Sequence, residues 1–152
     1  MERLLSTILL SLVHCLSHFH DFDILPYLDE NITDILENPS LEYSEQEGYM
    51  LIKCLKTYKS KMNKILTYIE KNDPSIVEVI RHLYKVRGPS FLRAHPVKDN
   101  LLKTLNWTEA EFVYMNNLVR ENANLWQKLN INYIINHHWF DEFSTTEGND
   151  RI

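Results

Sequence analysis

Glycine, proline and cysteine are all scarce in this chain of 152 residues. It contains three glycines and five prolines, and no stretch alternates apolar and polar residues over the length of a strand. Because hairpins need turn residues and half-buried strands need such alternation, the sequence predicts an all-α fold. The two cysteines, Cys15 and Cys54, are too few for a disulfide framework. We expect both to be reduced thiols on helix faces.

The chain also lacks an apolar run long enough to cross a bilayer. Residues 1–19 are rich in leucine, but polar side chains interrupt them between Ser6 and Ser17, and no cleavage site of small residues follows. Leucines at helical spacing give the segment one broad apolar face: Leu5, Leu9, Leu12 and Leu16. We therefore expect a buried first helix in an intracellular protein, with a secretory signal peptide as the alternative.

Patterns typical of catalysis are missing as well. There is no Gly-rich phosphate loop, no Gly-x-Ser-x-Gly elbow and no Cys and His pair with a supporting motif, and the adjacent carboxylates Asp29 and Glu30 diverge on a helix. His14 and His18 have ligand-like spacing beside Cys15, but no second cluster completes a metal site. The sequence predicts no enzyme, no cofactor and no metal, with the histidines as polar residues at a helix end.

Charge is distributed unevenly along the chain. Residues 1–48 carry one basic and ten acidic residues, a net of -9, and residues 49–105 carry twelve and four, a net of +8. Residues 106–152 carry three and seven, a net of -4, which brings the whole chain to -5. The middle segment is therefore the part suited to a polyanion.

The longest predicted helix lies in this middle segment. Ser44 and Glu47 form a capping box, from which a helix extends to about Lys71. Its apolar stripe consists of Leu51, Leu55, Tyr58, Met62, Ile65 and Ile69. Its lysines, which lie away from the stripe, are Lys53, Lys56, Lys59, Lys61 and Lys64. They form either a solvated face or a surface for phosphates or an acidic partner.

A shorter helix and a basic loop follow. Asp73 and Pro74 occupy the cap and first-turn positions of this helix, which we expect to end near Gly88. The candidate nucleic-acid contacts are Lys85, Arg87, Arg93 and Lys98. Alternatively, Phe91 and Leu92 pin the loop to the core. Either way, this is the place where the sequence favours a nucleic-acid contact.

The most specific pattern lies between Trp107 and Leu129. Thr108 and Glu111 form a capping box, and Trp107 with Phe112 forms a hydrophobic staple, so a helix starts at Thr108. Residues 122–124 read Asn-Ala-Asn, which predicts a turn followed by a second helix. The expected core of this segment consists of Trp107, Phe112, Met115, Leu118, Trp126, Leu129 and Trp139.

This arrangement resembles a Myb/SANT domain, a homeodomain-like class in which spaced tryptophans build the core of three helices. The resemblance covers Asn106 to about Phe143, although Trp139 comes early for the third tryptophan and the family's Gly-Arg-Thr turn is missing. It implies a helical interaction region over residues 1–104, a three-helix module over residues 105–143 and a flexible tail over residues 144–152. The sequence leaves open whether the first region has a core of its own.

Charge decides what such a module would contact. The expected third helix, Asn130 to Phe143, contains no Arg or Lys, whereas a helix that reads the major groove needs cations for phosphates and base edges. The resemblance therefore implies a noncatalytic nuclear subunit of a larger DNA- or chromatin-modifying complex. Its partners would be protein subunits and, through the basic loop, double-stranded DNA, with no membrane and no small-molecule substrate.

More narrowly, size and richness in Asn, Lys, Ile and Tyr make the chain similar to the small accessory subunits of the ciliate DNA adenine methyltransferase complex. Three alternatives stay open. The tryptophan pattern is also compatible with ordinary core packing, and a stand-alone DNA-binding protein is a second alternative. The third is a viral Bcl-2-like inhibitor or adaptor, because Asn106-Trp107 and Trp139-Phe140-Asp141 resemble that family's groove motifs. The two motifs are, however, too close in the sequence to hold the two central helices expected between them.

Overall fold

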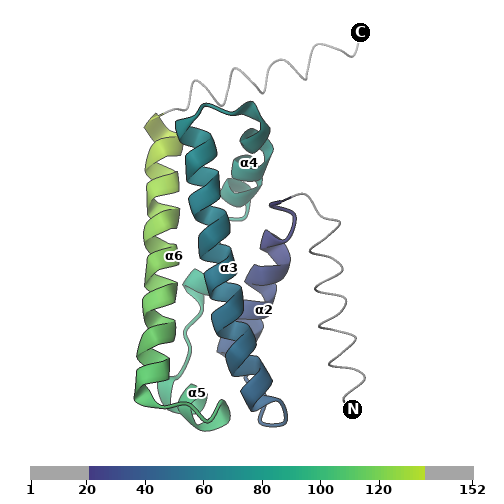
Figure 1. Cartoon of the computed structure of the whole chain (residues 1–152), viewed down its shortest axis with the longest axis vertical. Helices are drawn as coiled ribbons and strands as arrows, with labels where there is room; N and C mark the ends of the chain where they lie inside the picture. Colours follow the sequence, from purple (N-terminus) through teal and green to yellow (C-terminus); the bar gives the residue numbers. More distant parts are fainter. Residues whose placement is uncertain (1–20, 136–152) are drawn as a thin grey trace.

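The computed structural model describes residues 21–135 and shows a bundle of α-helices (Figure 1). The helices are α2 (Leu25–Glu37), α3 (Ser44–Glu70), α4 (Val77–Lys85), α5 (Lys98–Thr104) and α6 (Glu109–Ile135), with short 3-10 turns η1 (Pro74–Ile76) and η2 (Ser90–Arg93). No strand occurs within these residues, so the all-α prediction is confirmed for this part of the chain. The expected first helix, His14, Cys15, His18 and Trp139 lie outside the described residues.

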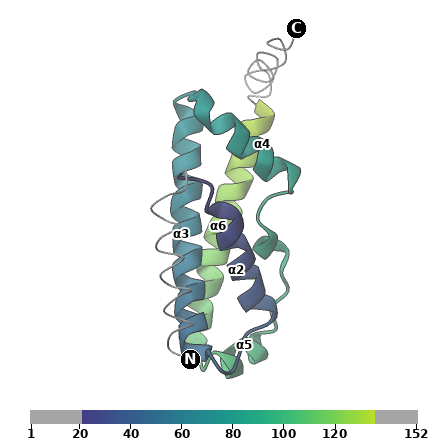
Figure 2. The ribbon, with the colours of Figure 1, turned by 90° about the vertical axis from the view of Figure 1, so that its right-hand side faces the viewer.

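The two longest helices form the axis of the bundle. Helices α3 and α6 lie side by side and run in the same direction, and α4, η2 and α5 return the chain from the end of α3 to the start of α6 (Figures 1 and 2). Helix α2 packs against α3 and runs the opposite way (Figure 2). This order brings α2 and α4, which are separated in the sequence by α3, to the same side of the bundle.

The apolar stripe predicted for α3 is buried over its whole length. The buried members are Leu51, Leu55, Tyr58, Met62, Ile65 and Ile69. They belong to one hydrophobic core that also includes buried residues of α2, α4, α5 and α6. The segment before residue 105 and the helix after it therefore share a core, which the sequence alone leaves open.

Of the three predicted helix starts, the one at Thr108 is confirmed and the one at Asp73 is confirmed in part, because Asp73 caps the 3-10 turn η1 and α4 itself begins at Val77. The Thr108 amide donates to Glu111 Oε2 at 2.7 Å and the Glu111 amide donates to Thr108 Oγ1 at 3.3 Å, as a capping box requires. Asp73 Oδ1 accepts from the Ser75 amide at 3.0 Å at the start of η1. The prediction of a capping box at Ser44 is wrong, because Tyr43 is the N-cap and Glu47 Oε2 accepts a hydrogen bond from the amide of Ser40 at 2.6 Å.

Helices α3, α4 and α5 end in the same way. Each is followed by a residue in the left-handed region: Asn72 at φ 52°, Arg87 at φ 61° and Asn106 at φ 53°. The next amide then closes a hydrogen bond to a carbonyl five residues earlier: Asp73 to Tyr68, Gly88 to Leu83 and Trp107 to Leu102. These are Schellman-type ends, which satisfy carbonyls that a helix terminus otherwise leaves unpaired.

The turn predicted at residues 122–124 is wrong, because α6 continues without a break from Glu109 to Ile135. Asn122 is completely buried against α3, where its amide group is hydrogen-bonded, and this packing outweighs the weak helix propensity of asparagine. Trp107 and Trp126 therefore do not flank a turn. Nineteen positions separate them, which is about 28 Å along a helix axis. The homeodomain-like arrangement of helices is not confirmed.

Candidate functional site

The four candidate nucleic-acid contacts do not form one patch. Lys85 lies in the last turn of α4, and in the segment that follows Arg93 Nη1 donates to the carbonyl oxygen of Arg87 at 2.6 Å. Lys98 begins α5, at the other end of the bundle (Figure 1). Its Nζ lies 2.6 Å from Glu109 Oε2 and 5.7 Å from the ring centre of Phe112. Of the four candidate contacts, the structure therefore joins only Arg87 and Arg93, and Lys85 precedes them at the end of α4.

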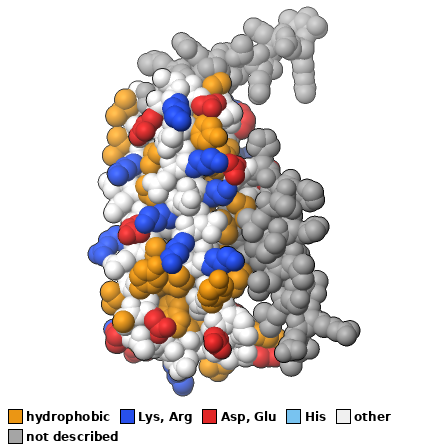
Figure 3. Space-filling view, in the orientation of Figure 1, with side chains coloured by type: hydrophobic (Ala, Val, Ile, Leu, Met, Phe, Trp, Pro, Cys, Tyr) orange, Lys and Arg blue, Asp and Glu red, His pale blue; other side chains and the backbone are white. Residues whose placement is uncertain are grey.

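The lysines of α3 all have partners within the chain. Lys59 Nζ lies 2.6 Å from Glu121 Oε2 on α6, and Lys61 and Lys64 both pair with Asp21. The two remaining ammonium groups lie over aromatic rings, Lys53 over Tyr49 at 5.9 Å and Lys56 over Tyr114 at 5.5 Å. Basic and acidic side chains are accordingly mixed on this face of the molecule (Figure 3). The row of lysines is not a bare cationic track for phosphates.

Asp21 joins the chain just before α2 to the middle of α3. Hydrogen bonds from Lys64 and then Lys61 lower the pKa of the Asp21 carboxyl from 3.8 to about 2. The same contact raises the pKa of Lys64. Because the group is largely exposed, solvent screens the interaction and its effect on stability is modest.

Both tryptophans of the described residues pack on glycines. A Cβ atom on Gly48 would lie 2.6 Å from Trp107 Nε1, and one on Gly88 would lie 2.4 Å from Trp126 Cε2. Tyr84 of α4 adds to the second contact, with its ring centre 6.0 Å from that of Trp126. The predicted core residues Phe112, Met115, Leu118 and Leu129 are all buried, and the two tryptophans are half-buried. They pack against α3 and the end of α4 rather than against a second helix of a module.

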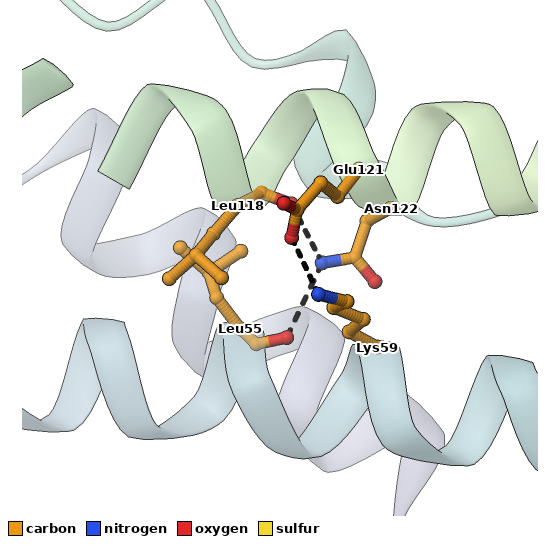
Figure 4. Close-up of polar contacts among 5 residues, drawn as sticks. All are labelled: Leu55, Lys59, Leu118, Glu121 and Asn122. Atoms are coloured by element: carbon orange, nitrogen blue, oxygen red, sulfur yellow. Dashed lines mark hydrogen bonds and ion pairs between the residues drawn. The ribbon is translucent and has the colours of Figure 1, made fainter. Parts of the chain in front are cut away.

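One polar contact is buried between α3 and α6 (Figure 4). Asn122 Nδ2 donates to the carbonyl oxygen of Leu55 at 3.2 Å and to that of Leu118 at 3.0 Å. Asn122 Oδ1 has no hydrogen-bond partner among the described residues. The neighbouring ion pair between Lys59 and Glu121 lies on the exposed side of the same contact.

No protein-family model, curated protein or solved structure matches this chain. Its function is therefore inferred from the chemistry of its own surface.

The titratable side chains buried within residues 21–135 are held in their neutral forms. Cys54 is buried, and burial raises the pKa of its thiol to about 11, so the nucleophilic thiolate is scarce near neutral pH. Burial also raises the pKa of Tyr58. Within residues 21–135, no three His, Cys, Asp or Glu side chains are placed to hold a metal ion. None of the helices there is long and apolar enough to span a membrane.

A cavity between α2 and α4 has a volume of about 770 Å³. Its apolar lining consists of Phe22, Leu25, Tyr58, Val79, Leu83 and Val86. Its acidic lining includes three exposed carboxylates, Asp23, Glu30 and Asp34, for which the structure shows no ion pair within residues 21–135. We call this cavity the α2–α4 groove. Its described lining combines an apolar wall with net negative charge.

The sequence contains a signal for one wall of this groove. Asp23, Tyr27, Glu30 and Asp34 are separated by four, three and four positions, which places them on one face of a helix. The other wall is not apparent from the sequence, because α4 reaches α2 only after the chain has passed along the whole of α3. The groove is a product of the tertiary arrangement.

A second exposed surface lies where α3 and α6 begin. Tyr49, Ile52, Trp107 and Tyr114 line a cavity of about 620 Å³, and we call them the aromatic patch. Tyr49 is 66% exposed and Tyr114 is 45% exposed. Tyrosine and tryptophan are enriched at protein interfaces, so this patch has the composition of a contact surface.

Proposed function

We propose that this protein is a noncatalytic docking subunit of a larger complex that acts on DNA or chromatin, and that its main contacts are with proteins. The observation that carries the proposal is the pairing of its cations. Lys59, Lys61, Lys64 and Lys98 each pair with a carboxylate of the same chain. Non-specific affinity for nucleic acid comes chiefly from cations that neutralise phosphates, so such pairing weakens it.

The surface that remains is suited to protein partners. The aromatic patch exposes Tyr49 and Tyr114, and the α2–α4 groove exposes apolar side chains beside acidic ones. Arg87 and Arg93, held together by one hydrogen bond, supply an auxiliary contact with DNA. The nuclear setting is supported by the resemblance of residues 106–143 in sequence, and a role in DNA adenine methylation by the size and composition of the chain and the pattern from Trp107 to Leu129.

Affinity purification of the tagged full-length chain from its own cells tests the docking function. We expect nuclear proteins that modify DNA or chromatin to co-purify with it. Replacement of Tyr49 and Tyr114 by serine should reduce their recovery, whereas Tyr43→Ser, outside the patch, serves as the control. Recovery of the chain alone would overturn the proposal. Recovery with a cell-death factor and no nuclear protein would favour the Bcl-2-like alternative.

A salt-titrated binding assay on duplex DNA tests the auxiliary contact. We expect weak binding that is further reduced by Arg87→Glu with Arg93→Glu and is unchanged by Arg120→Glu with Lys128→Glu. Proteins that recognise a specific DNA sequence bind it with a dissociation constant of about 10⁻⁸ M or lower at physiological salt. Affinity of that order, lost when Arg120 and Lys128 are replaced, would mean that α6 reads DNA and would overturn the proposal.

A further inference from the structure

We infer that the α2–α4 groove binds a basic amphipathic helix of a partner protein. This inference rests on the proposed docking function and names the partner chemistry of one site. Both walls have helical periodicity. Helix α2 with the turn before it presents Asp23, Glu30 and Asp34, whereas α4 presents Val79, Leu83 and Val86 at spacings of four and three. A helix in the groove would face carboxylates on one side and apolar side chains on the other.

The dimensions suit a helix of a few turns. The groove volume of about 770 Å³ is that of a small-molecule pocket, about 300 to 1,000 Å³, so the groove would take one face of a helix rather than enclose it. The three carboxylates span eleven positions, from the turn before α2 to Asp34, which would be about 16 Å or three turns at the rise of a helix. A partner helix therefore meets all three carboxylates if it carries lysine or arginine about once per turn along one edge.

Charge selects a basic occupant over an acidic or neutral one. The groove contains two further carboxylates, but both are engaged, since Asp29 accepts from the amides of Ser90 and Phe91 and Glu78 pairs with Arg81. Among residues 21–135, no lysine or arginine lines the groove, and His82 is the one ionisable base in its lining. The described lining of the groove therefore carries net negative charge, and complementary charge both steers a partner and sets its register.

The edge and floor of the groove are held in place before any partner binds. The Asp29 carboxylate fixes the start of η2 because it accepts hydrogen bonds from the backbone amides of Ser90, at 2.8 Å, and Phe91, at 3.0 Å. The ring of Phe91 in turn packs edge to face on Tyr58 of the floor, with centres 5.1 Å apart. Fewer groups have to be ordered on binding, which favours affinity for a given contact area.

The test uses two synthetic helical peptides of about 18 residues, or five turns, with the same leucine face. One has lysine along the edge of that face and the other has glutamate. Titration into the full-length chain, followed by fluorescence anisotropy, should show binding of the lysine peptide and not of the glutamate peptide. The triple variant Asp23→Asn, Glu30→Gln and Asp34→Asn should weaken binding of the lysine peptide by about tenfold to a hundredfold.

A matched triple variant removes charge elsewhere. Glu37→Gln, Glu42→Gln and Glu70→Gln neutralise three exposed carboxylates outside the groove and should leave binding of the lysine peptide unchanged. Val86→Ser, which alters the apolar wall without a change of charge, should weaken binding. Circular dichroism and thermal unfolding establish that each variant is folded.

Each contrary result has a distinct meaning. Equal binding of the two peptides, or an equal loss in both triple variants, would overturn the groove assignment. A dimer of the chain that dissociates in the groove variant would identify a second copy as the occupant and would also overturn it. If no peptide binds while nuclear partners still co-purify, the groove assignment fails and the docking function stands. If nothing co-purifies, the docking function fails.

Discussion

The indole of Trp126 lies directly on the backbone of Gly88, so that a side chain at Gly88 would overlap its ring. Gly88 also has a φ of 78°, which side chains other than that of glycine rarely tolerate. Trp107 lies on Gly48 in the same manner. One tryptophan thus fixes α6 to the loop after α4, and the other fixes the start of α6 to the first turns of α3.

Gly88→Ala should destabilise the protein by about 2 to 4 kcal/mol. Roughly 1 kcal/mol comes from the left-handed backbone and the rest from overlap with Trp126. Chemical denaturation measures the change. The smaller ring in Trp126→Phe should recover part of the loss when the two substitutions are combined. The same stability for Gly88→Ala and the wild type would show that the ring does not lie on this glycine.

Gly48→Ala is the matched comparison and should cost less. Gly48 lies within α3, where alanine is favoured by about 1 kcal/mol over glycine. This gain offsets part of the overlap with the half-buried Trp107, which has more room to shift. A larger loss at Gly48 than at Gly88 would contradict the role assigned to the left-handed backbone.

What the sequence predicts correctly is what local chemistry determines. The stripe from Leu51 to Ile69 and the capping box at Thr108 each depend on residues within a few turns of one another, and both are confirmed. The Ser44 box has the same pattern as the Thr108 box. It fails because Glu47 has a better partner, the amide of Ser40, in a loop whose course the pattern does not contain.

The errors concern contacts between distant segments. Asn122 favours a turn by propensity, but it lies in α6 because the carbonyl of Leu55, in α3, gives its side chain a partner. The sequence leaves two interpretations for the lysines of α3, because their partners Asp21 and Glu121 lie in distant segments. The α2–α4 groove depends in the same way on two helices that α3 separates in the sequence.

Arg87→Gly should stabilise the protein by about 1 kcal/mol. Arg87 has a φ of 61° at the end of α4, a position that glycine occupies without a steric cost. The carbonyl oxygen that accepts from Arg93 belongs to the backbone and is retained. Arg81→Gly makes the same chemical change inside α4 and should instead cost about 1 kcal/mol. Destabilisation by both substitutions would mean that the Arg87 side chain itself contributes to folding.

The Asp21 carboxyl should titrate well below its ordinary pKa. Its pKa of about 2, against 3.8 without neighbours, means that the pairing with Lys61 and Lys64 favours the folded state above about pH 4. This stabilisation is lost as the pH falls toward 2. Carbon-detected NMR of the carboxyl measures the midpoint. Lys64→Met should raise the midpoint, and Lys53→Met, which removes a cation over Tyr49, should leave it unchanged.

Asn122→Asp should be one of the most damaging conservative substitutions in the chain. The amide nitrogen of Asn122 faces the carbonyl oxygens of Leu55 and Leu118, and a carboxylate oxygen in its place would repel both in a site without solvent. An uncompensated buried charge costs about 3 to 5 kcal/mol. Because a protonated carboxyl can donate one hydrogen bond, the loss relative to the wild type should shrink as the pH falls.

Asn122→Leu should be neutral or stabilising, since it removes a buried amide whose Oδ1 has no partner within the described residues. In this variant the backbone carbonyls of Leu55 and Leu118 still lie within α3 and α6. The two hydrogen bonds from Asn122 therefore mainly satisfy its own amide nitrogen and add little to the stability of the fold. Denaturation of both variants across a range of pH separates the two effects. A loss of more than about 2 kcal/mol in Asn122→Leu would mean that the amide stabilises the contact of α3 with α6 directly. A small, pH-independent loss in Asn122→Asp would mean that water reaches this position.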